Sequence, residues 1–109
     1  WDVHHPYRFM HEKPETTYQN LRPWLCHTHF KDSTATADGY RYALPGFGDV
    51  PLEEIVGVLK DGGYDGFYSL EWVNRASSLR TLPTICARSD GAIAGSLLRG
   101  GRRRAAAPL

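Results

Sequence analysis

Three short stretches of the sequence predict the fold: WDVHH at residues 1–5, HTHFKD at residues 27–32 and SLEW at residues 69–72. Each combines apolar or aromatic residues with a carboxylate or an imidazole, and a segment that can form a helix separates each from the next. Parallel (β/α) barrels present functional side chains in this way, from the C-terminal ends of successive strands. The sequence therefore predicts an α/β protein whose polar side chains meet at one mouth of a parallel sheet.

Proline positions and apolar spacing predict the elements between these stretches. Pro14 and Pro51 suit the first turns of two helices, and Gly62-Gly63 predicts a left-handed cap for the second. After Pro51, apolar residues recur at helical spacing and form one stripe. The stripe consists of Leu52, Ile55, Val56 and Leu59. The expected order is a strand end at 1–5, a loop at 7–13, a helix at 14–21, a strand at 24–30, a polar loop at 32–39, a short strand at 40–44, the helix after 51, and a strand at 67–71.

Charge and composition divide the chain near residue 74. Residues 1–74 hold 6 Lys and Arg against 11 Asp and Glu, whereas residues 75–109 hold 7 Arg against the single Asp90. All 13 aromatic residues and all five histidines lie in the first part. We therefore expect a partial barrel at 1–74 and an Arg-, Ala- and Gly-rich tail at 75–109, either disordered or out of frame, with a weak helix at 87–98.

Cysteine usage and hydropathy restrict the class of protein. Cys26 and Cys86 belong to no C-x-x-C pattern and suggest no disulfide framework, which favours a reduced, cytoplasmic setting. No apolar run reaches the length of about 18 residues that a membrane span needs, so no membrane partner is expected.

Candidate metal ligands stand at the ends of the predicted strands. Asp2 and His5 form a D-x-x-H pattern, His29 is the second histidine of H-x-H, and Glu71 ends the last strand. Two carboxylates and one imidazole suit Mn²⁺, Mg²⁺ or a catalytic Zn²⁺ with open positions. The alternative for Asp2 is a strand-end carboxylate that pairs with a neighbouring base. His4 and His27 fit packed or supporting positions better than metal ligation.

The chain resembles the sugar phosphate isomerase/epimerase family, which has a xylose isomerase-like TIM barrel and shares its superfamily with endonuclease IV. Four motifs carry the resemblance: WDVHHP at 1–6, CHTHFKDS at 26–33, YALPGFGDVPL at 42–52 and GGYDGFYSLEW at 62–72. The fold implied is the C-terminal part of a (β/α)₈ TIM barrel, truncated, with about strands six to eight.

The resemblance implies one divalent metal ion (Mn, Mg, Co or Zn) bound by Asp2, His29 and Glu71. The family's remaining ligand, a glutamate on the fifth strand, would precede residue 1. His5 resembles a substrate-contacting histidine. Lys31 and Asp32 would lie at the barrel mouth, either contacting substrate or pairing with each other.

The activity implied is isomerisation or epimerisation of a sugar or sugar phosphate. Protons would move next to the carbonyl, with Glu71 as ligand and acid/base, while the metal stabilises an enediolate.

Two alternatives to this activity remain. The chain could be a non-catalytic remnant, inactive alone and prone to self-association through an exposed sheet edge. It could also be an endonuclease IV-like AP endonuclease, but Tyr40 and Tyr42 stand where that enzyme's D-x-H ligands belong. Because residues 1–74 are also net acidic, we do not expect nucleic acid as a partner.

Overall fold

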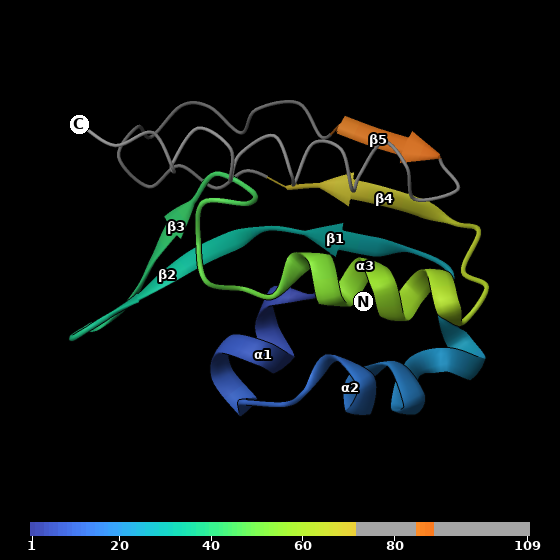
Figure 1. Ribbon diagram of the computed structural model, residues 1–109, viewed down its shortest axis with the longest axis horizontal. Helices are drawn as coiled ribbons and strands as arrows, with labels where there is room; N and C mark the ends of the chain where they lie inside the picture. The colour runs from blue at the N-terminus through green and yellow to red at the C-terminus, as the bar shows by residue number, and fades with distance from the viewer. Residues whose placement is uncertain (72–84, 89–109) are drawn as a thin grey trace.

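The computed structural model of the protein describes residues 1–71 and 85–88. These residues form an α/β structure in which helices gather on one side of the strands (Figure 1). The helices are α1 (His4–Met10), α2 (Pro14–Leu21) and α3 (Leu52–Asp61), with the 3₁₀ turn η1 (Arg22–Trp24). The strands are β1 (Thr28–Phe30), β2 (Asp32–Thr36), β3 (Gly39–Ala43), β4 (Phe67–Leu70) and β5 (Ile85–Arg88).

Parallel pairing organises the main sheet, whose strand order is β1-β4-β5. β1 and β4 run parallel, with Phe30 opposite Leu70. On the other edge of β1, Asp2 forms a parallel bridge with His29, and Val3 N donates to His29 O at 3.0 Å. The N-terminal segment, β1 and β4 are therefore three parallel neighbours in chain order, as successive strands of a (β/α) barrel are.

The two faces of these strands differ in chemistry because side chains alternate along a strand. Phe30 and Tyr68 are buried in the hydrophobic core on one face. His29, Lys31 and Glu71 belong to the other set of alternating positions, and they contact one another through polar atoms. One face of these strands therefore packs in the core, and the other carries the polar side chains.

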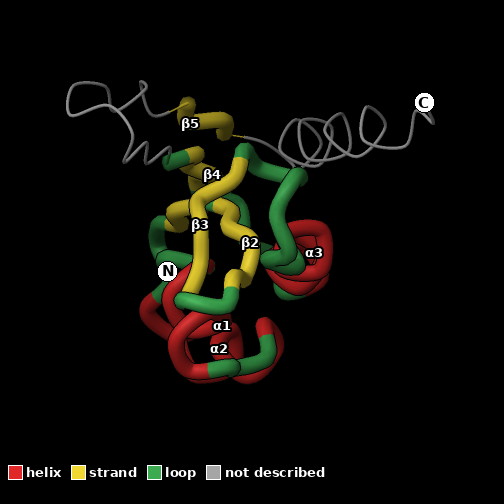
Figure 2. The backbone as a smooth tube through the Cα atoms, turned by 90° about the vertical axis from the view of Figure 1, so that its left-hand side faces the viewer, coloured by secondary structure: helices red, strands yellow, loops and turns green. Residues whose placement is uncertain are grey.

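Helix α3 supplies much of the core. Its predicted apolar stripe is buried: Leu52, Ile55, Val56 and Leu59. α2 packs beside α3 through Tyr18, whose hydroxyl donates to Gly62 O at 3.1 Å. Figure 2 shows the molecule from the side, with α1 and α2 below the strands and α3 to the right of β2. None of the described helices has the length and apolar character needed to cross a membrane.

The predicted boundaries of α2 and α3 are close to those observed, but the cap of α3 differs in detail. Gly62 has φ −80° and continues the right-handed backbone, whereas Gly63 alone is left-handed, at φ +76°. Gly62 N donates to Val58 O and Tyr64 N donates to Leu59 O, so the last carbonyls of the helix are satisfied.

The predicted strand end at 1–5 and loop at 7–13 are wrong in part. Only Asp2 bridges to β1, and α1 begins at His4 and runs to Met10. Asp2 Oδ1 accepts the backbone N–H of His4 at 3.1 Å, which satisfies a free donor at the helix start. Pro6 lies in the first turn, where its missing N–H costs no intrahelical hydrogen bond, so it does not stop this helix.

The strand predicted at 24–30 is shorter, and the polar loop predicted at 32–39 is mostly a strand. Arg22–Trp24 forms the 3₁₀ turn, which leaves β1 only three residues. Asp32–Thr36 pairs antiparallel with Gly39–Ala43, with Ser33 opposite Tyr42. The polar composition of β2 favours a loop, but a hairpin forms because the backbone N–H and C=O groups of β2 pair with those of β3.

Of the predicted tail at 75–109, the structure describes only residues 85–88. They form β5, antiparallel to β4, with Ile85 opposite Leu70. No strand was predicted there, and the helix predicted at 87–98 is wrong for its first two residues. The rest of the predicted tail, including its predicted disorder, lies outside the described residues.

Replacing Leu59 by Ala should destabilise the fold by about 2–5 kcal/mol, because Leu59 is fully buried and its removal leaves a cavity. Urea unfolding followed by circular dichroism measures the change. Gln19→Ala on the exposed side of α2 is the control and should change stability by less than about 0.5 kcal/mol. Equal effects of the two substitutions would contradict the packing described for α3.

Candidate functional site

The five residues predicted for the site form one cluster around the ammonium group of Lys31. Lys31 Nζ lies 2.7 Å from Asp2 Oδ2 and 2.9 Å from Glu71 Oε2. His29 Nδ1 lies 3.7 Å from the same oxygen of Glu71, and His5 Nδ1 lies 3.6 Å from Asp2 Oδ2. Residues separated by up to 69 positions in the sequence (2 and 71) therefore converge on one cation.

Parallel strands bring these residues together. His29 and Lys31 are two positions apart, so they share a face of the chain that runs through β1. Lys31 directly follows β1 and Glu71 directly follows β4, and Glu71 N donates to Phe30 O at 2.8 Å. Asp2 comes from the segment bridged to the opposite edge of β1. The cluster lies at the C-terminal ends of the parallel strands.

Lys31 is the most buried member of the cluster. Its side chain is 7 % exposed, whereas those of His5 and His29 are about half exposed, at 52 % and 48 %. Burial opposes the charged form, but hydrogen bonds and charge from Asp2 and Glu71 outweigh it and raise the pKa of Lys31. The ammonium is therefore a fixed positive charge held between two carboxylates.

The donor chemistry of the cluster suits a hard divalent cation, but its present geometry suits an ammonium. Asp2, His29 and Glu71 offer two carboxylates and one imidazole, the set expected for such a metal. Within residues 1–71, however, no three His, Cys, Asp or Glu side chains are placed to hold one metal ion. The point shared by Asp2 and Glu71 is occupied by Lys31 Nζ.

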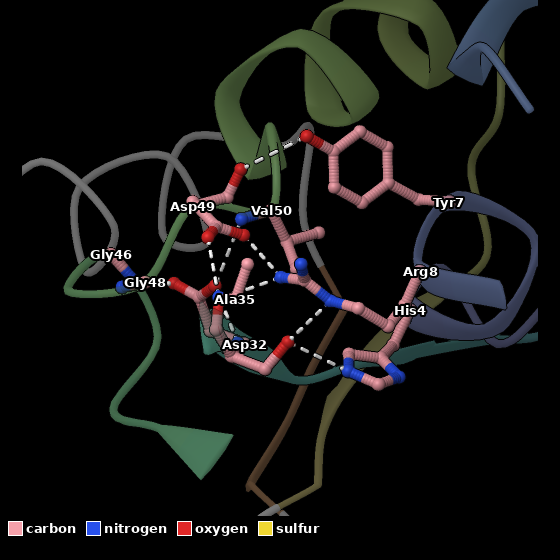
Figure 3. A network of polar contacts seen from close by, with 10 residues as sticks. His4, Tyr7, Arg8, Asp32, Ala35, Gly46, Gly48, Asp49 and Val50 are labelled. Atoms are coloured by element: carbon pink, nitrogen blue, oxygen red, sulfur yellow. Dashed lines mark hydrogen bonds and ion pairs between the residues drawn. The ribbon is translucent and has the colours of Figure 1, made fainter. Parts of the chain in front are cut away.

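Asp32 neither contacts Lys31 nor faces the site. Asp32 is 1 % exposed, and its carboxylate accepts four backbone N–H groups (Figure 3). The donors are Ser33, Gly46, Gly48 and Val50, at 2.8 to 3.2 Å. The predicted alternatives for Asp32 are both wrong, because these hydrogen bonds engage both oxygens and anchor the loop that leads into α3. Gly48 is required there, since a Cβ would collide with that carboxylate.

A second, partly buried network joins α1 to the same loop (Figure 3). His4 Nε2 lies 2.9 Å from Ser33 Oγ, which also accepts Arg8 Nε at 3.0 Å. Arg8 donates as well to Ser33 O and forms an ion pair with Asp49. Burial lowers the pKa of His4 to about 4; Asp2 opposes this effect, while the cations around His4 add to it. Sequence reasoning placed His4 correctly as a packed residue but missed Arg8, whose role depends on the unpredicted helix α1.

An aromatic cluster lies next to the site. Phe9, 53 % exposed, has its ring centroid 5.5 Å from that of His5 and 5.6 Å from that of Tyr40. His4 lies beneath them, with centroid distances of 5.1 Å to Tyr40 and 5.6 Å to Tyr42. Through His5, the cluster connects directly to Asp2.

Replacing Asp32 by Asn should cost about 2–5 kcal/mol, because the amide NH₂ would face two backbone N–H donors that the carboxylate now satisfies. Denaturant unfolding at pH 7 measures the loss. Asp38→Asn, in the exposed β2–β3 turn, is the matched control and should be close to neutral. A neutral Asp32→Asn variant would contradict the described anchoring of residues 46–50.

The stability of the protein should fall as the pH drops from about 6.5 to about 4. In that range the unfolded chain protonates His4, whereas the folded chain, with its lowered pKa, does not. The contribution is therefore present above pH 6.5, reaches at most about 3 kcal/mol, and is lost on acidification. Unfolding measured from pH 4 to pH 7 should show a smaller slope in His4→Gln, while His11→Asn, exposed and left-handed, keeps the wild-type slope. An unchanged slope in His4→Gln would assign the effect to other groups.

Comparison with known proteins agrees with this geometry. The family model described as xylose isomerase-like TIM barrel matches residues 1–95 of the 109 residues. Searches of the curated proteins and of the solved structures found no match. The match includes the N-terminal segment, β1, β4 and every member of the cluster around Lys31. The chain belongs to the xylose isomerase-like TIM barrel family.

Proposed function

We propose that the chain carries the site of a divalent-metal-dependent sugar or sugar phosphate isomerase or epimerase, built on strands six to eight of a barrel. The observation that carries the proposal is the convergence of Asp2, Lys31 and Glu71 at the C-terminal ends of three parallel neighbours. In this class of barrel the active site lies at that end of the strands. The family match supports an isomerase- or epimerase-type activity or one related to it.

In this proposal Asp2, His29 and Glu71 bind one ion of Mn, Mg, Co or Zn. When bound, such a metal polarises the carbonyl and the neighbouring hydroxyl of a sugar. Glu71 is about one-third exposed and borders the half-exposed His29, so its carboxylate can reach a substrate and take up or return a proton at the carbon next to the carbonyl. His5, about half exposed beside Asp2, can donate to a substrate hydroxyl.

The aromatic cluster supports a sugar as the substrate class. Sugar rings present C–H groups on one face and hydroxyls around the rim, and aromatic rings contact the C–H face favourably. Phe9 is half exposed and adjoins His5, which also lies beside Asp2. A small ring stacked on Phe9 would place its hydroxyls toward the polar cluster. Two tyrosines, Tyr40 and Tyr42, complete this wall where a nuclease of the superfamily would need metal ligands.

Deuterium incorporation tests the proposed chemistry directly. The full chain is incubated in D₂O with Mn²⁺ and a panel of aldoses, ketoses and their phosphates, and NMR detects exchange at the carbon next to the carbonyl. We expect exchange with at least one member of the panel. Glu71→Gln should reduce the rate by about 10²- to 10⁴-fold, because the amide cannot accept the proton.

The control variant is Asp38→Asn, which lies in the exposed β2–β3 turn and should retain the wild-type rate. Thermal unfolding of each variant separates loss of chemistry from loss of fold. Absence of exchange across the whole panel, with a folded wild-type chain, would contradict the proposal and favour the alternative of a non-catalytic chain that needs other residues to act.

A further inference from the structure

We propose that Lys31 is a built-in counter-cation that competes with the divalent metal for Asp2 and Glu71. Its ammonium and the metal would occupy the carboxylate pair in turn and never together. The inference rests on the proposed function for the identity of the competing ion. It rests on the structure alone for the position of the ammonium between the two carboxylates.

The geometry would bring the two cations close together if both were bound. Lys31 Nζ lies 2.7 Å from Asp2 Oδ2 and 2.9 Å from Glu71 Oε2. Carboxylate oxygens approach a small divalent metal to about 2.0–2.2 Å. A metal bound to both of these oxygens would therefore lie within about 5 Å of an ammonium that had not moved. At that distance, in a partly buried site, the repulsion between the two cations is large.

The burial of Lys31 indicates that the ammonium belongs to the site and is not a passing surface contact. Its side chain is 7 % exposed, and its neighbours favour the charged form strongly enough to offset burial. Without this charge, Asp2 and Glu71 would face each other across the same point with no cation between them. Lys31 therefore stabilises the metal-free chain and at the same time opposes metal binding.

Competition has a quantitative consequence for metal affinity. The metal would bind only those molecules in which the ammonium has left the carboxylates. The apparent Kd then equals the intrinsic Kd divided by the fraction of such molecules. Removing the charge while keeping the length of the side chain should remove this factor. Keeping a positive charge on a different side chain should preserve it.

Calorimetric titration of the full chain with Mn²⁺ tests the proposal with two matched variants. We expect Lys31→Met to bind Mn²⁺ at least about tenfold more tightly than the wild type, and Lys31→Arg to bind no more tightly than the wild type. A Lys31→Met, Asp2→Asn double variant should lose the gain, because it removes one of the two contested oxygens. Thermal unfolding in a chelator establishes that each variant is folded.

A measurement on the wild-type chain keeps the proposal testable if Lys31→Met does not fold. Lysine acetylation is followed by peptide mass spectrometry with and without Mn²⁺. Lys31 should be protected without metal and become reactive at saturating Mn²⁺, whereas the exposed Lys13 and Lys60 should react equally in both states. Continued protection of Lys31 at saturating Mn²⁺ would overturn the proposal.

The outcomes separate this inference from the proposed function. Equal Mn²⁺ affinity in the wild type and Lys31→Met, lost in Asp2→Asn, would overturn the competition and leave the proposed metal site intact. Absence of Mn²⁺ binding in both the wild type and folded Lys31→Met would overturn both. Tighter binding in Lys31→Met that is lost in the double variant would support both.

Discussion

The two-residue alternation of side chains along β1 and β4 determines which residues form the core and which form the polar cluster. It places Phe30 and Tyr68 in the core and leaves His29, Lys31 and Glu71 for the polar cluster. A shift of one residue in the pairing of β1 with β4 would exchange the two sets. It would bury charged groups among apolar side chains and expose the ring of Phe30. The hydrophobic core and the candidate site therefore fix the same register.

Asp32 shows how the fold supports that register without taking part in the site. The buried carboxylate accepts hydrogen bonds from backbone N–H groups of residues 46–50 and so fixes the connection into α3. Burial raises the pKa of Asp32, and the hydrogen bonds from the backbone limit the increase. The next residue, Ser33, bonds to His4 and Arg8, which ties α1 to the same connection. The first two residues of β2 thus position two helices, and Lys31, just before them, is directed toward the carboxylates.

Sequence reasoning succeeded where the signal was local or carried by a motif. α2 and α3 follow from Pro14, Pro51 and an apolar stripe, and β1 and β4 follow from motifs that each contain a carboxylate or an imidazole. It failed where a distant partner decides the structure. The polar residues of β2 form a strand only because β3 pairs with them, and α1 forms although Pro6 lies near its start. The motifs contain all five residues of the cluster, but the central position of Lys31 was not predictable, because it depends on two carboxylates from segments far apart in the sequence.

That central position changes the meaning of the candidate site. In the sequence, two carboxylates and an imidazole indicate a metal site, and nothing about these three residues indicates a competing cation. In three dimensions the lysine two residues after the imidazole lies between the carboxylates and neutralises much of their charge. The same negative charge that would attract a metal therefore already stabilises the protein. In the proposed competition, Lys31, which is predicted to contact substrate, also sets how readily the site accepts a cation. The strength of its two ion pairs then limits the affinity that Asp2 and Glu71 can offer to any other positive ion.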